Sequence, residues 1–152
     1  MTSAVEDVVG LLEYATTRLQ DRMVGLTDDE WNWQPVLGDG LVTIRWRLDH
    51  VAAALGEERN WTWLGADVSG APSVAAATGA DAAITVVADS SAAFAGLARG
   101  LGTTAGDPLG SVAGPYADDS RLSLVLHVVD ELVHHAAEAA LIRDLYAATR
   151  SA

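Results

Sequence analysis

Apolar residues recur every three or four positions over four long stretches of the chain, the spacing that gathers them on one face of a helix. The stretches run from about Ser3 to Gly25, from Thr43 to Leu64, from Ala80 to Leu101, and from Asp119 or Ser120 to about Ala148. At 1.5 Å per residue, a helix of about 20 residues is about 30 Å long. Four such helices predict an all-α four-helix bundle.

Capping signals agree with these boundaries. Ser3 and Glu6 have the spacing of a capping box, and Thr27 and Glu30 repeat it, which predicts one further short helical turn. Thr43 is a suitable N-cap for the second long helix. The starts of these elements are therefore better defined by the sequence than their order in the bundle.

Two long connections are expected, after the second and third helices. Residues 66–78 are small and polar and contain Pro72, and residues 102–115 are rich in Gly and Pro. Either could carry the chain across the bundle, so the order of the helices is left open. The β-branched run 83–87 is compatible with a short strand, but helical pattern on both sides favours a helix. No linker divides residues 1–152, which we expect to form a single domain.

Composition narrows the function classes. The chain has no cysteine, which excludes a disulfide scaffold, a thiolate zinc finger and a cysteine nucleophile. It has no lysine and a formal net charge of −12, so it should repel nucleic acids and anionic membranes. We see neither a signal-peptide pattern nor an apolar run near the roughly 20 residues that span a bilayer. A cytoplasmic protein acting on a small molecule is the expectation.

All four histidines fall within two of the predicted helices: His50 in the second, and His127, His134 and His135 in the fourth. On a helical wheel that starts at His127, Glu131 lies at about 40°, His135 at about 80° and His134 at about −20°. The large apolar residues centre between about 60° and 140°. His135 therefore lies within the buried stripe, and Glu131 lies just beside it.

Glu131 and His135 are four residues apart on one helix face, a spacing that lets both contact one metal ion. Burying the Glu131 carboxylate without a partner would cost several kcal/mol, which a divalent cation would offset. His50, on the inward face of the second helix, can supply a third ligand. A site of His50, Glu131 and His135 would leave coordination positions open, as catalytic sites do.

Other interpretations of these residues remain open. An inward histidine is often only a core residue with a satisfied hydrogen bond, and His127 and Glu131 could be a surface pair. His134 is most simply a solvated neighbour. Glu131 and His134 also have the Glu-x-x-His spacing of di-iron bundles. The second pair that such a site needs is missing, because Arg47 precedes His50 by three residues.

Three segments resemble the DinB/YfiT superfamily in order and register: GLTDDEWNWQP, TIRWRLDHVAAALGEE and LVLHVVDELVHHAAEAALIRDLY. The similarity is nearest to actinobacterial members related to mycothiol-dependent maleylpyruvate isomerase. It implies a four-helix bundle with zinc or nickel at one end of the core. It also matches His50, Glu131 and His135 to a ligand set of two His and one Glu. A register shifted by one would instead use Asp130 and His134.

The resemblance suggests a metal-dependent transferase or isomerase that uses mycothiol or another small thiol. Arg47, one turn before His50, is the predicted cofactor-binding residue, as a clamp for a substrate carboxylate, and Glu57 is a candidate partner of the site. A non-catalytic or stress-related metal-binding bundle and a metal-dependent hydrolase are the alternatives. A homodimer is also expected, from the family and from five tryptophans that one small core would not fully hide.

Overall fold

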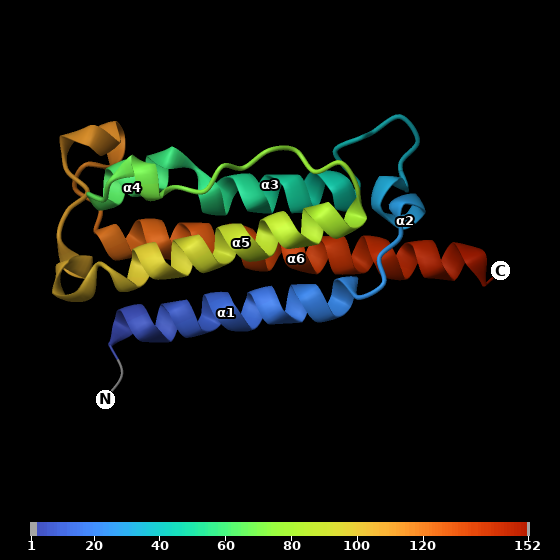
Figure 1. Ribbon diagram of the computed structural model, residues 1–152, viewed down its shortest axis with the longest axis horizontal. Helices are drawn as coiled ribbons and strands as arrows, with labels where there is room; N and C mark the ends of the chain where they lie inside the picture. The colour runs from blue at the N-terminus through green and yellow to red at the C-terminus, as the bar shows by residue number, and fades with distance from the viewer. Residues whose placement is uncertain (1–2, 152) are drawn as a thin grey trace.

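The computed structural model describes residues 3–151, which form a bundle of helices (Figure 1). The long helices are α1 (Ala4–Met23), α3 (Ile44–Gly56), α5 (Ala80–Arg99) and α6 (Arg121–Arg150). The shorter elements are α2 (Asp28–Asn32), α4 (Glu58–Leu64), η1 (Val68–Gly70), η2 (Gly102–Gly106) and η3 (Ser111–Tyr116). The described residues contain no strand, and 83–87 lie inside α5. The predicted all-α four-helix bundle is confirmed.

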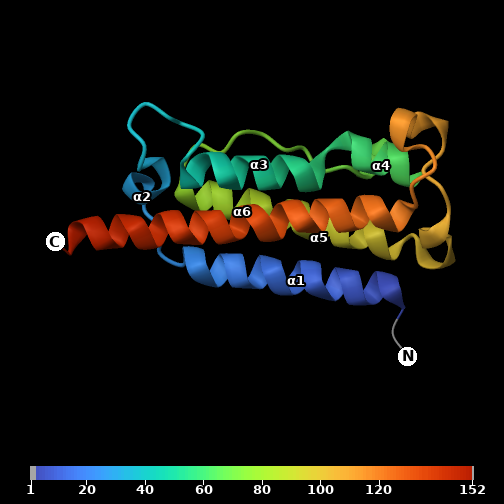
Figure 2. The same ribbon diagram turned by 180° about the vertical axis from the view of Figure 1, so that it is seen from behind.

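The helix order, which the sequence left open, is visible in the two views of the ribbon. Helices α1 and α6 run in one direction, and α3 and α5 run in the other (Figures 1 and 2). Both α1 and α3 pack against α5 and α6. The connection between α4 and α5 returns along the length of the bundle, so it is the crossover that parallel α3 and α5 require.

The predicted helix from Thr43 to Leu64 is interrupted at Glu57, which has extended backbone angles (φ −56°, ψ 131°). Asn60 explains the break. Its fully buried side-chain amide donates hydrogen bonds to the carbonyls of Ala54 and Leu55 at 2.8 and 3.3 Å. These carbonyls belong to the last turn of α3, where helical partners run out. The helix therefore ends at Gly56 because a side chain from the next helix satisfies its terminus.

Gly56 also allows the crossover segment to pass close to α3. A Cβ atom at this position would overlap the Val74 side chain and lie 3.2 Å from Pro72. Further along, the Ala77 amide donates to the Asp49 carboxylate at 3.5 Å. The segment is thus held against the outer side of α3, and it leaves the side of α3 that faces α6 free for the site described below.

Helix α5 is the most apolar element of the bundle. Among the described helices it alone is long and apolar enough to cross a membrane by length and composition. Its apolar side packs into the core against α1 and α3, with Phe94 fully buried. A hydrogen bond of 2.6 Å between the hydroxyls of Thr16 and Ser91 joins it to α1. These contacts are those of a core helix.

The tryptophans are covered more completely than the composition suggested. Trp31 and Trp61 are buried, and Trp33, Trp46 and Trp63 are half-buried. The tryptophans therefore offer less exposed surface for a dimer interface than their number suggested. The homodimer stays a prediction, which sedimentation at micromolar concentration would test.

Candidate metal centre

His50, Glu131 and His135 come together where α3 packs against α6. The Oε2 atom of Glu131 lies 2.9 Å from His50 Nε2 and 3.4 Å from His135 Nε2. One ligating atom from each residue lies within 4.8 Å of the others. The two imidazole rings are 4.7 Å apart and nearly perpendicular. The cluster that the helical spacing predicted is therefore present.

The cluster lies at the border between the core and solvent. The His135 side chain is 13% exposed, Glu131 29% and His50 38%. Glu131 is thus less buried than the sequence argument assumed, and the cost of desolvating its carboxylate is correspondingly smaller. All three side chains are therefore partly accessible to solvent.

Trp46 fixes the orientation of both imidazoles. It lies one turn before His50 on α3, and its indole stacks on the His50 ring at 4.8 Å with the planes 6° from parallel. The same indole meets the edge of the His135 ring at 5.6 Å. The indole therefore restricts the rotation of both histidine side chains before any ligand binds.

Glu138 supplies the remaining contact of His135. Its Oε2 atom lies 2.6 Å from His135 Nδ1 and 2.6 Å from Arg47 Nε. A carboxylate accepts hydrogen bonds, so it selects the tautomer of a neutral His135 that carries its proton on Nδ1. The bare lone pair on Nε2 then points toward the Glu131 carboxylate. Two acceptors facing each other at 3.4 Å favour a cation between them.

The sequence did not identify Glu138 as part of the site. It lies near the cluster face on the helical wheel, and its spacing of three residues from His135 was the available signal. The decisive contact is with Arg47, which comes from another helix. No pattern within α6 indicates that partner.

Arg47 is engaged by the protein. Besides its ion pair with Glu138, its Nη1 donates to the Leu41 carbonyl at 3.1 Å, and its guanidinium lies 4.7 Å from the Trp46 ring. These contacts hold Arg47 in place, and its role as a clamp for a substrate carboxylate stays a prediction. Glu57, the other candidate, is exposed at the break after α3 and pairs with Arg59 at 2.8 Å. It makes no contact with the cluster.

The other α6 residues lie outside the cluster. His134 is exposed, and its Nε2 lies 3.0 Å from Glu138 Oε1, on the opposite carboxylate oxygen from His135. Asp130 is exposed as well, which disfavours the shifted register that pairs it with His134. His127 is exposed one turn before Glu131, and its charge acts on that carboxylate without a hydrogen bond between them among the described contacts.

Both carboxylates of the site are held in the charged form. The hydrogen bond from His50 lowers the pKa of Glu131 and outweighs burial, which alone would raise it; the charges of the neighbouring histidines add to the lowering. Burial also raises the pKa of Glu138. The hydrogen bond from His135 and the charge of Arg47 together overcome this, so its pKa is lowered as well. An ionised Glu131 is the form that binds a cation.

The donor set fits zinc or a similar divalent ion. Two imidazole nitrogens and one carboxylate oxygen are a common catalytic zinc set. Tetrahedral ligands about 2.0–2.1 Å from zinc lie about 3.3 Å from one another. The observed separations of 2.9 and 3.4 Å between Glu131 Oε2 and the two imidazole nitrogens are close to that value.

The comparison with family models agrees with the helical-bundle fold. No curated protein and no solved structure matches the chain significantly. The family model of the DinB superfamily matches residues 11–139, which include all four bundle helices in whole or in part and the three residues of the cluster. The chain belongs to the DinB superfamily.

Proposed function

We propose that this chain is a metal-dependent enzyme in which His50, Glu131 and His135 bind one divalent ion, zinc or alternatively nickel. We further propose that it uses a small thiol such as mycothiol in a transferase or isomerase reaction. The observation that carries the proposal is the convergence of three ligating atoms within 4.8 Å on side chains that are partly exposed to solvent.

The proposed chemistry follows from the charge of the ligands. A bound divalent ion lowers the pKa of a coordinated thiol or water and so generates a nucleophile near neutral pH. One carboxylate and two neutral imidazoles leave a net positive charge at the centre, which favours an anionic thiolate. The chain has no cysteine, so a sulfur nucleophile must come from a small molecule.

The protein side chains would have separate tasks. His50, Glu131 and His135 hold the ion, and Glu138 keeps the proton of His135 on Nδ1 so that Nε2 faces the centre. Trp46 shields the two imidazoles from water on one side. The thiol and its electrophilic partner would meet on the solvent-exposed part of the cluster.

Cobalt substitution tests the metal and the thiol separately. Untagged protein is loaded with Co²⁺, and its visible spectrum is recorded before and after addition of a small thiol. We expect a tetrahedral cobalt spectrum that gains a sulfur-to-metal band with thiol, and neither signal in His135→Ala. Absence of the first spectrum contradicts the metal site. A cobalt site that hydrolyses esters or amides without thiol, and shows no sulfur band, replaces the thiol chemistry with hydrolysis.

A further inference from the structure

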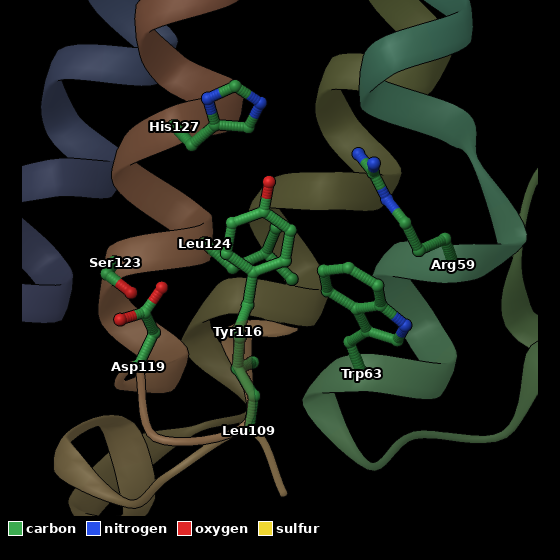
Figure 3. A pocket seen from close by; sticks show the side chains of 8 residues that line it. All are labelled: Arg59, Trp63, Leu109, Tyr116, Asp119, Ser123, Leu124 and His127. Atoms are coloured by element: carbon green, nitrogen blue, oxygen red, sulfur yellow. The ribbon is translucent and has the colours of Figure 1, made fainter. Parts of the chain in front are cut away.

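A pocket of about 350 Å³ opens between α4, η3 and the start of α6 (Figure 3). Leu109 and Leu124, both buried, form apolar parts of its wall. Trp63 and Tyr116 add two aromatic rings with centroids 6.0 Å apart and planes tilted by 39°. Flat apolar surface of this kind favours a planar ligand, because such a ligand can contact the rings over a large area.

The pocket lies next along α6 to the cluster of His50, Glu131 and His135, which is called the metal cluster below because it is the candidate metal-binding site. His127 lines the pocket and lies one turn before Glu131, a displacement of about 6 Å along the helix axis. The His127 end of the pocket therefore lies about one helical turn along α6 from Glu131.

Polar hydrogen-bond donors gather at the end of the pocket near His127. Figure 3 shows the Tyr116 hydroxyl and the Arg59 guanidinium directed toward this end. The guanidinium lies 5.2 Å from the Trp63 ring, and one of its nitrogens pairs with the exposed Glu57. A guanidinium has five N–H donors, so this pair leaves others for a ligand. Arginine beside an aromatic ring is well suited to bind a planar carboxylate.

One acidic residue, Asp119, also lines the pocket. It is exposed and lies at the other end from Arg59 and His127 (Figure 3). The two ends of the pocket therefore differ in charge, and the cationic end is the one nearer the metal cluster. An amine could bind Asp119, but it would lie at the end away from the cluster.

We propose that this pocket binds a small flat carboxylate, with its ring against Trp63 and Leu124 and its carboxylate on Arg59. The inference rests on the proposed function in one respect: it takes this ligand to be the substrate of the metal-dependent reaction, or a part of that substrate. Binding itself requires no metal. It can therefore be tested on metal-free protein.

The test follows the tryptophan indole N–H signals of ¹⁵N-labelled, metal-free protein during titration with benzoate. Trp63→Phe assigns the Trp63 signal. We expect a saturable shift of that signal, and affinities about tenfold lower for benzamide and for benzylamine, which lack the carboxylate. Arg59→Gln should weaken benzoate binding by about tenfold. Arg18→Gln, which alters an exposed arginine stacked on Tyr14 of α1, is the matched control and should bind normally.

Several results would overturn the proposal. Equal binding of benzamide would show a purely apolar pocket, and tighter binding of benzylamine would show that Asp119 determines the ligand. Shifts in other indole signals without a Trp63 shift would place benzoate elsewhere. Because the protein is metal-free throughout, a failure here leaves metal binding by His135 standing. Loss of the metal site would equally leave the pocket result standing.

Discussion

Two charged clusters on α6 use similar residues in different ways. In the first, here called the clasp, Arg143 donates from Nε to Glu30 at 3.0 Å, and from Nη1 to the carbonyls of Arg22 and Val24 at 2.6 and 2.9 Å. Each of these donor–acceptor contacts joins α6 to the end of α1 or to the capping box of α2. In the metal cluster, a single oxygen of Glu131 lies near two imidazole nitrogens.

The difference separates a structural ion pair from a candidate ligand site. In the clasp, the guanidinium supplies donors that match a carboxylate and the free carbonyls at a helix end. In the metal cluster, neutral imidazoles and a carboxylate bring more lone pairs together than protons. The hydrogen bond from His50 satisfies one lone pair of Glu131, but the lone pair of His135 Nε2 faces that carboxylate and is available to a cation or an extra proton. We therefore expect changes in the clasp to affect the free energy of unfolding, and changes in the metal cluster to affect metal binding.

The largest effect should come from removing a ligand. His50→Ala and His135→Ala should each reduce the zinc content of purified, untagged protein to background, because two ligands hold zinc much more weakly than three. His134→Ala is the matched control: it removes an exposed imidazole next to His135 and should retain zinc. Elemental analysis of the three variants measures this. Zinc lost in His134→Ala and kept in His135→Ala would contradict the assigned ligands.

The clustering of these three side chains was predictable from the sequence because it depends largely on local geometry. Glu131 and His135 share a helix face by their spacing, and His50 points inward on the only other histidine-bearing helix. The break at Glu57 was not predictable from periodicity, because it depends on the Asn60 side chain turning back onto the carbonyls of α3. Helical wheels describe one helix at a time and contain no information of this kind.

The role of Arg47 shows the same limit across two helices. The wheel places it beside His50, which suggested a substrate clamp. Its ion pair with Glu138 depends on how α3 and α6 are rotated and aligned against each other. That arrangement is set by the packing of the whole core, so a pattern in either helix alone could not predict it. The clasp of Arg143 and Glu30 was missed for the same reason.

Breaking the clasp should have the next largest effect. Arg143→Met keeps the aliphatic stem but removes the donor to Oε1 of the half-buried Glu30 and to the carbonyls of Arg22 and Val24. We expect the free energy of unfolding to fall by about 2–4 kcal/mol, with zinc binding unchanged. Urea denaturation measures the first and elemental analysis the second. Arg99→Met, which removes exposed ion pairs with Glu6 and Glu13, should have a much smaller effect on unfolding.

Changing the residue that orients His135 should weaken zinc binding without abolishing it. Glu138→Gln keeps the side-chain shape but removes the charge that holds the proton on His135 Nδ1. We expect zinc affinity to fall about 10–100-fold, the usual effect of losing a carboxylate that orients a metal-bound histidine. Competition with a zinc chelator measures the affinity. Asp130→Asn, on the exposed side of α6, is the control and should bind zinc normally. Equal losses of zinc affinity in both variants would show that the effect comes from net charge and not from the orientation of His135.

The smallest expected effect is a pH dependence of stability that belongs to the clasp. Burial raises the pKa of Glu30, but hydrogen bonds from Arg143 and Thr27 outweigh it, so the pKa of Glu30 is lower in the folded protein than its usual 4.5. A lowered folded pKa contributes stability that is fully present above about pH 4.5 and is lost as the pH falls through the folded value.

Glu30→Gln, which cannot ionise, should remove this contribution. At pH 7 we expect it to be less stable than the parent protein by about 1–2 kcal/mol, measured by urea denaturation. The difference should shrink below pH 4.5, because protonation then removes the charge of Glu30 in the parent protein too. Asp29→Asn, which makes the same charge change on the exposed side of α2, controls for net charge. If the difference in free energy of unfolding between the parent protein and Glu30→Gln stays constant from pH 7 to pH 3, the charge of Glu30 makes no contribution and only its shape does.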